Sequence, residues 1–159
     1  MPTTLYRNHF QIAYVVREID AAMRLFRDRY GVARWHVMDM GALNPGSPTR
    51  YIATAYSGEV MLELIDSLQD APSIYGNWLA DGQAVRLHHL GFWAHSPEEL
   101  AAARSRFEAN GQAIAAEGRF GDILDFLYAD CVAELGHYYE IVHLLPAGRD
   151  FFAATPRND

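Results

Sequence analysis

One spacing occurs twice in this chain of 159 residues, and it constrains the fold more than any other feature of the sequence. In the first half, Gln11 opens an apolar run, and Glu63 lies in a later run 52 residues on (63 − 11). In the second half, His89 opens a run, and Glu140 lies in another run 51 residues on (140 − 89). Each half therefore places one potential ligand at the start of a strand-like segment and one carboxylate in a later segment. Four such side chains can converge on one metal ion.

The segments between these residues repeat the order strand, helix, strands. Asp20 is expected to cap a helix that stops at Gly31. In the second half, Ser96 and Pro97 begin a helix, with Glu99 completing a capping box. Further strands are expected at Trp35–Met40, Arg50–Tyr56, Val60–Ile65, Ala113–Ala116, Asp125–Ala129 and Tyr138–Val142. The sequence therefore predicts an α+β fold built as βαβββ twice.

This repeat predicts one domain over residues 1–159. Module one covers about residues 8–66, and module two covers about residues 88–145. The segment 67–87 connects them, with a short helix expected within 72–79, and residues 146–159 form a tail. A chain of this length can bury one real core.

Composition limits the classes of partner and site. Acidic residues outnumber basic ones 20 to 13, and the net charge of −7 with scattered arginines argues against a nucleic-acid partner. No apolar run reaches the roughly 20 residues that a membrane span needs, and the N-terminus lacks the pattern of a signal peptide. Cys131 is the single cysteine, so a metal site must use nitrogen and oxygen ligands. We expect a cytoplasmic protein.

Strand alternation predicts which way the four candidate ligands face. Side chains two residues apart share a face, so Gln11 lies with Ala13 and Val15, and His89 lies with Gly91 and Trp93. The carboxylates likewise have mostly apolar companions, which are Met61 and Ile65 for Glu63, and Tyr138 and Val142 for Glu140. A carboxylate on an apolar face is costly to bury unless it is paired, protonated or bound to a metal.

Each candidate also has an ordinary structural explanation. A glutamate in a half-buried strand is usually its exposed member, and a single histidine is more often a hydrogen-bonded core residue. His9 shares a face with Gln11 and could supply a nitrogen ligand in its place. A one-residue bulge would exchange His88 for His89. A purely structural role for each residue does not predict that candidate ligands occur at matched positions in both halves of the chain.

Several short segments give the chain a family resemblance. They are Phe10–Val16 with Asp20 and Ala21, Phe26–Gly31, Met61–Ile65, Ser73–Tyr75 with Leu79, Leu87–Phe92, and Tyr139–Val142. On these segments the chain resembles the vicinal oxygen chelate superfamily of glyoxalases, bleomycin-resistance proteins and extradiol dioxygenases. Within that superfamily it resembles glyoxalase-like and methylmalonyl-CoA epimerase-like members.

The resemblance implies two tandem βαβββ modules that form a half-open β-barrel around a metal or ligand cavity. It implies the metal ligands Gln11, Glu63, His89 and Glu140, a set similar to that of zinc-type glyoxalase I. One imidazole, two carboxylates and an amide suit a divalent ion such as Zn, Ni, Co or Mn. The extradiol dioxygenases of the family use two histidines and one glutamate to bind iron. This chain departs from that set, because only one of its four candidate ligands is a histidine, and the resemblance therefore does not imply oxygen chemistry.

The expected activity is that of a metal-dependent lyase or isomerase. It would move a proton next to a carbonyl of a small-molecule or acyl-CoA substrate, through a metal-stabilised enediolate or enolate. Glu140 is the candidate base and Glu63 the candidate second acid or base. The alternative is a non-catalytic binding or resistance protein that uses the same cavity. The family also implies a homodimer, or modules that pair within one chain.

Overall fold

The computed structural model describes residues 4–159, and these divide into two compact units. The first, which we call the Glu140 unit, comprises the N-terminal residues up to Gln11 together with His89–Ala153. The second, the Glu63 unit, comprises Ile12–His88 and Ala154–Asp159. Both units mix helices with strands, so the predicted α+β class is confirmed.

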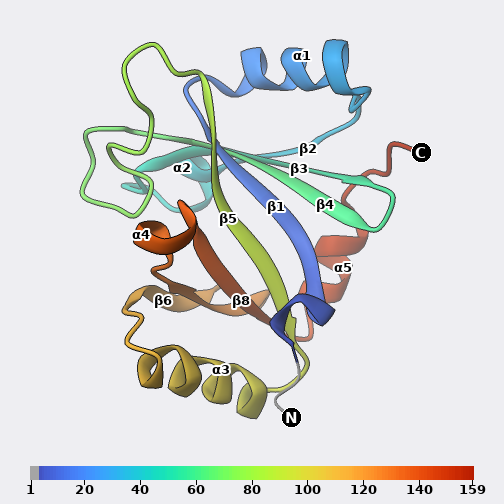
Figure 1. The fold of residues 1–159 in the computed structure, drawn as a ribbon. Coiled ribbons are helices and arrows are strands. Elements are labelled where there is room, and N and C mark those ends of the chain that lie inside the picture. Colours follow the sequence, from blue (N-terminus) through green and yellow to red (C-terminus); the bar gives the residue numbers. More distant parts are fainter. Residues whose placement is uncertain (1–3) are drawn as a thin grey trace. The chain divides into compact units, whose positions relative to one another are not determined.

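The Glu63 unit is a β-sheet with helix α1 on one face (Figure 1). Its elements are β1 (His9–Val16, from Ile12 onward), α1 (Ile19–Tyr30), β2 (His36–Asp39), α2 (Met40–Leu43), β3 (Thr49–Ser57) and β4 (Val60–Ser67). The strand order is β2-β3-β4-β1, and β2, β3 and β4 pair antiparallel. The first βαβββ module expected from the sequence is therefore present.

Helix α1 is held by apolar packing and by its two caps. Phe26 and Val16 belong to the core that α1 forms with the sheet. The N-cap is Glu18, whose carboxylate accepts hydrogen bonds from the backbone N–H groups of Asp20 and Ala21. The predicted cap at Asp20 was wrong by two residues, because the helix begins at Ile19 rather than after Asp20. The predicted stop is confirmed, since Gly31 has a φ of 75°.

The Glu140 unit repeats this architecture with a longer helix. Its elements are η1 (Leu5–Asn8), the start of β1, β5 (Val85–Ala94, from His89 onward), α3 (Pro97–Ala109), β6 (Ile114–Phe120), β7 (Leu124–Ala129), α4 (Val132–Leu135), β8 (Tyr138–Leu144) and α5 (Gly148–Ala153). The strand order is β5-β8-β7-β6, in which only the β5–β8 pair is parallel. The second βαβββ module is therefore confirmed as well.

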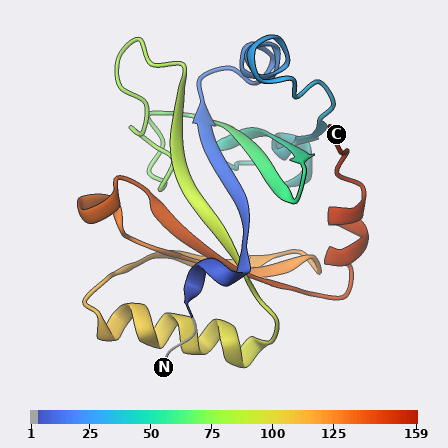
Figure 2. The ribbon, with the colours of Figure 1, turned by 45° about the vertical axis from the view of Figure 1, so that its right-hand side comes forward.

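Helix α3 covers one face of the β5–β8 sheet, as Figure 2 shows. Ser96 accepts a hydrogen bond from the backbone N–H of Glu99 at 3.2 Å, and Pro97 occupies the first helical position. The Glu99 carboxylate in turn accepts a hydrogen bond from the backbone N–H of His95 at 2.7 Å. The start of α3 was therefore predicted correctly, with the return bond displaced by one residue from the usual capping box.

The connecting segment differs from its prediction. Residues 72–79 form turns rather than a short helix. The Gln69 side chain donates to the carbonyls of Ser67 and Tyr75 and accepts from the backbone N–H of Leu79. Because these backbone groups are satisfied by a side chain, the segment needs no helical hydrogen bonds. Strand β5 also begins at Val85, four residues before the predicted start at His89.

The helices of the described residues are short. The longest are α3, with 13 residues, and α1, with 12. Over residues 4–159 no helix is long and apolar enough to cross a bilayer.

Candidate metal and acid–base site

Three of the four predicted ligands meet inside the Glu140 unit. The His89 Nε2 atom lies 3.3 Å from Gln11 Oε1 and 3.2 Å from Glu140 Oε2. Gln11, His89 and Glu140 are 3%, 0% and 8% exposed. An amide oxygen and a carboxylate oxygen are therefore directed at one imidazole nitrogen in a nearly dry environment. We call these residues the Gln11–His89–Glu140 trio.

Strand register explains how residues so far apart in sequence converge. In the parallel pair of β5 and β8, His89 lies opposite Tyr138 and Gly91 lies opposite Glu140. Residues in register, and those two apart on each strand, share a face of the sheet. His89 and Glu140 therefore lie diagonally across one face of the sheet. Phe92 of β5 and Ile141 of β8 lie on the opposite face, which α3 covers.

Gly91 leaves the space that Gln11 occupies. A Cβ atom at Gly91 would lie 2.7 Å from Gln11 Oε1, 2.9 Å from Gln11 Cβ and 3.1 Å from Phe10 Cε1. All three distances are shorter than ordinary van der Waals contacts. The carboxamide of Gln11 thus reaches His89 because residue 91 has no side chain. The sequence interpretation gave Gly91 no role, although a glycine inside a strand often marks close approach of other atoms.

The donor set of the trio fits a divalent ion. Ligand atoms bound to one ion at about 2.1 Å are roughly 3.0–3.4 Å apart at octahedral or tetrahedral angles. The distances of 3.3 Å and 3.2 Å from Nε2 agree with this spacing. Among residues 4–159, no three His, Cys, Asp or Glu side chains gather as a metal cluster. The trio contains two such residues, and its third donor is an amide.

The two alternative histidines are engaged elsewhere. The Nε2–H group of His9 donates to the backbone carbonyl of Gln11 at 2.9 Å, and its ring lies 5.4 Å from that of Phe92. The Nε2–H group of His88 donates to the carbonyl of Ile74 at 3.0 Å. The His88 ring also packs against Tyr75 and Trp78, with ring centroids 4.7 Å and 4.8 Å apart. These contacts favour Gln11 and His89 as the ligand residues.

Glu63, the fourth predicted ligand, belongs to the Glu63 unit. It lies in β4 between Met61 and Ile65, which are each 1% exposed, and is itself half-buried. Its cross-strand neighbour on β3 is Thr54, whose hydroxyl lies 3.1 Å from that of Thr155 in the C-terminal segment. The prediction that Glu63 joins the same metal ion remains a prediction.

Two tyrosines adjoin the trio. The ring of Tyr128 meets that of His89 edge to face at 5.1 Å, and Tyr128 lies opposite Glu140 on β7. Tyr138 lies opposite His89, and burial, together with the nearby Asp130 carboxylate, raises the pKa of its hydroxyl. Tyr138 therefore stays protonated at neutral pH. The sequence offered no means of separating these tyrosines from ordinary core aromatics.

The comparison with protein families agrees with this architecture. The model of the Glyoxalase/Bleomycin resistance protein/Dioxygenase superfamily matches residues 10–128, about three quarters of the chain. The chain belongs to this superfamily. The match contains Gln11, Glu63 and His89 and ends before Glu140. No curated protein matches the chain.

Solved structures of the same fold include several epimerases. The methylmalonyl-CoA epimerase of Mycobacterium tuberculosis is 18% identical, with a TM-score of 0.64 and coverage of 97% of both chains. A variant of the Streptomyces coelicolor epimerase, in complex with 2-nitronate-propionyl-CoA, is 19% identical with a TM-score of 0.62, over 86% of this chain and 96% of that one. A hypothetical protein from Bacillus halodurans is 17% identical with a TM-score of 0.64, over 85% and 92%. At such identities the likeness confirms the predicted fold alone.

Proposed function

We propose that this chain is a divalent-metal-dependent isomerase or lyase that moves a proton on the carbon next to a substrate carbonyl. The observation that carries the proposal is the buried trio, in which Oε1 of Gln11 and Oε2 of Glu140 are both directed at Nε2 of His89. A buried imidazole, carboxylate and amide directed at one point make a donor set for Zn, Ni, Co or Mn. Glu63 is the proposed fourth ligand.

The metal, when bound, would polarise the substrate carbonyl as a Lewis acid. The protein groups then handle the proton. Glu140 is the proposed base, since its carboxylate is buried and contacts His89 through Oε2. Glu63 is the proposed second acid or base. The low exposure of the trio excludes water, which strengthens the electrostatic interactions of the bound substrate.

An acyl-CoA is the substrate class that the comparisons support best. Several structural neighbours described as methylmalonyl-CoA epimerases share the fold, and one of these structures contains methylmalonyl-CoA itself. We propose a small acyl-CoA with an acidic proton next to its thioester carbonyl. A homodimer and the two modules at residues 8–66 and 88–145 are further parts of this proposal.

The decisive experiment measures metal content and proton exchange together. The chain is purified without a metal-binding tag, analysed for metals, and offered Zn, Ni, Co or Mn. Glu140→Gln removes the charge at nearly constant shape, and Glu134→Gln is the control at an exposed glutamate. Wild type and control should hold about one ion per chain, while Glu140→Gln should lose it.

Activity is read as exchange of the α-proton of methylmalonyl-CoA in deuterated water. The wild type should catalyse exchange, and Glu140→Gln and Glu63→Gln should each lower the rate by about 10²–10⁴, the usual contribution of a general acid or base. A Glu59→Gln variant is the control for Glu63, because the Glu59 side chain is 95% exposed. A wild-type protein that refuses all four metals would overturn the proposal and favour a small-molecule binding role for the same cavity.

A further inference from the structure

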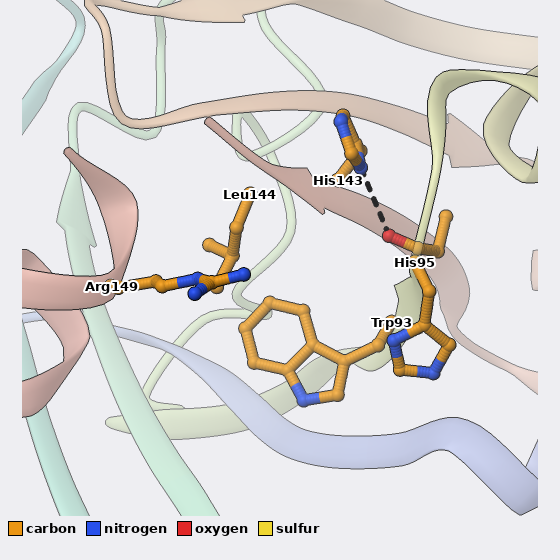
Figure 3. A pocket seen from close by; sticks show the side chains of 6 residues that line it. Trp93, His95, His143, Leu144 and Arg149 are labelled. Atoms are coloured by element: carbon orange, nitrogen blue, oxygen red, sulfur yellow. Dashed lines mark hydrogen bonds between the residues drawn. The ribbon is translucent and has the colours of Figure 1, made fainter. Parts of the chain in front are cut away.

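A second cavity lies in the Glu140 unit, away from the trio. Its volume is about 250 Å³, and it is lined by Trp93, Ala94, His95, His143, Leu144 and Arg149. Figure 3 shows that Arg149, His95 and His143 come from separate segments and surround the Trp93 indole. We call this the Arg149 pocket. One arginine and two histidines therefore line a single cavity.

Arg149 supplies a cation that no carboxylate neutralises. Over residues 4–159 its side chain has no ion pair or hydrogen bond, whereas Arg50, Arg104 and Arg119 each have a carboxylate partner. The neighbouring Gly148 packs closely, because a Cβ there would lie 2.3 Å from the carbonyl oxygen of Ile123. Arg149 itself is exposed, so its guanidinium is accessible to a ligand at the pocket wall.

The carboxylates near the pocket are already engaged. Asp125 receives two hydrogen bonds from Arg119, which is the main reason that the pKa of Asp125 is lowered. The Glu98 carboxylate receives hydrogen bonds from its own backbone and from Ser96. The charge of Arg149 is thus left for a ligand. The acidic residue nearest to it in sequence is Asp150, which also lies on α5.

His143 adds a donor that depends on protonation. Its Nδ1–H group donates to the carbonyl of Ala94 at 3.1 Å, the dashed line in Figure 3. In a neutral ring the other nitrogen, Nε2, is then an acceptor and repels an anion. A protonated ring offers Nε2–H as a donor. A protonated His143 would therefore bind an anion better than the neutral ring does.

The pocket lies at a defined distance from the trio along the same strands. Trp93 is four residues beyond His89 on β5, and Leu144 is four residues beyond Glu140 on β8. At about 3.3 Å per residue, each separation is roughly 13 Å. A ligand with a reacting group at the trio could therefore place a second group in the Arg149 pocket only across an extended linker.

We propose that the Arg149 pocket binds a phosphoryl group, held by Arg149 and by protonated His143 and His95 against the Trp93 indole. The source is either free phosphate or the phosphate of a nucleotide, such as the one in an acyl-CoA; the latter case rests on the proposed function. A planar guanidinium can donate two parallel hydrogen bonds to two oxygens of a phosphoryl group, whereas an ammonium group cannot.

The test follows binding of sulfate, ADP and adenosine by NMR, observing the indole N–H of Trp93. Sulfate keeps a charge of −2 at every pH used, so any pH dependence belongs to the protein. Arg149→Ala should weaken sulfate and ADP binding by about tenfold or more, the scale of one lost charge-assisted bidentate contact. Arg29→Ala, at an exposed arginine of α1, should leave both unchanged.

The pH arm tests the histidines. Sulfate binding should be tighter at pH 6 than at pH 8, because a protonated imidazole donates to an anion where a neutral one does not. The charged groups around His143 are Glu98 and Asp125, which interact with it, and Arg149, which lines the same pocket. His143→Asn retains a donor for the Ala94 carbonyl but has no second nitrogen, so its affinity should vary less with pH. An unchanged pH dependence in this variant would remove His143 from the site.

The remaining outcomes separate the possible sources and the two proposals. Binding of ADP at least tenfold tighter than sulfate indicates a nucleotide, and similar affinities indicate a free oxyanion. The proposal that the Arg149 pocket binds a phosphoryl group would be overturned if Arg149→Ala bound sulfate and ADP as tightly as wild type does. It would also be overturned if adenosine bound as tightly as ADP. Glu140→Gln should leave sulfate binding intact, so failure of the metal site and failure of this pocket are distinguishable.

Discussion

Replacing Gly91 with alanine tests the packing that brings Gln11 to His89. The new methyl group would lie 2.9 Å from Gln11 Cβ and 3.1 Å from Phe10 Cε1, where carbon atoms prefer about 3.5–4.0 Å. Gln11 Cβ is attached to the β1 backbone, so it cannot move away without shifting the strand. Overpacking of this kind costs about 1–3 kcal/mol. We expect Gly91→Ala to lower the free energy of unfolding by that amount.

The same substitution should weaken metal binding. The methyl group would also lie 2.7 Å from Gln11 Oε1, which forces the amide away from His89 Nε2. Urea unfolding of the metal-free protein measures the packing cost, and metal titration of the folded protein measures the loss of the amide ligand. For a chain of this size, the stability loss corresponds to a fall in Tm of roughly 2–12 °C.

Gly118→Ala is the matched control, since Gly118 lies inside β6 of the same unit. Its Cβ would approach only the ring edge of Phe126, at 3.3 Å from Cζ, and that ring can move. An alanine there should be neutral or stabilise by about 0.4–1 kcal/mol through the unfolded state. If Gly91→Ala is as stable as this control and binds metal as tightly as wild type, the reasoning about Gln11 is refuted.

Three further predictions concern stability. Asp66→Ala removes the buried partner of the half-exposed Arg50 and an acceptor at the start of α1, and should cost about 3 kcal/mol in urea unfolding; a loss below 1 kcal/mol would contradict this. Asn158→Ala removes four hydrogen bonds between the C-terminal segment and the rest of the Glu63 unit. It should cost about 1–2 kcal/mol and speed hydrogen exchange where this segment pairs with β3, and equal exchange rates would argue against that anchor. Burial and the hydrogen bond to Tyr6 raise the pKa of Tyr139, so the contribution of this hydroxyl to stability should be constant below pH 10 and be lost above it, where the unfolded chain ionises first. Tyr139→Phe should flatten that alkaline decline, and an unchanged slope would show that another group causes it.

The local elements were largely predictable, because they depend on neighbours in sequence. Ser96 and Pro97 mark the start of α3, and the φ of Gly31 confirms the predicted end of α1. The prediction at Asp20 failed by two residues, since the Glu18 carboxylate accepts the hydrogen bonds of the first helical N–H groups instead. The predicted helix within 72–79 failed because Gln69 satisfies the backbone there, a contact that no local pattern shows.

The candidate site was predictable in composition but only partly in geometry. Alternation along β1 and β5 correctly placed Gln11 and His89 on buried positions. It did not separate His9 from Gln11, since the two share a face, and it placed His88 on the opposite face from His89 only if the strand has no bulge. Their hydrogen bonds to backbone carbonyls, seen only in the folded chain, direct both rings elsewhere.

The sequence by itself determined the repeated βαβββ order and the residue types at the matched strand positions, because alternation and capping are local. Tertiary structure decided that Gly91 leaves room for Gln11, and that Arg149 and His143 line one cavity. Those relations depend on register between strands and on packing across many residues. The spacing of the four predicted ligands therefore indicates a site, and the parallel pairing of β5 with β8 is what brings His89 and Glu140 into contact.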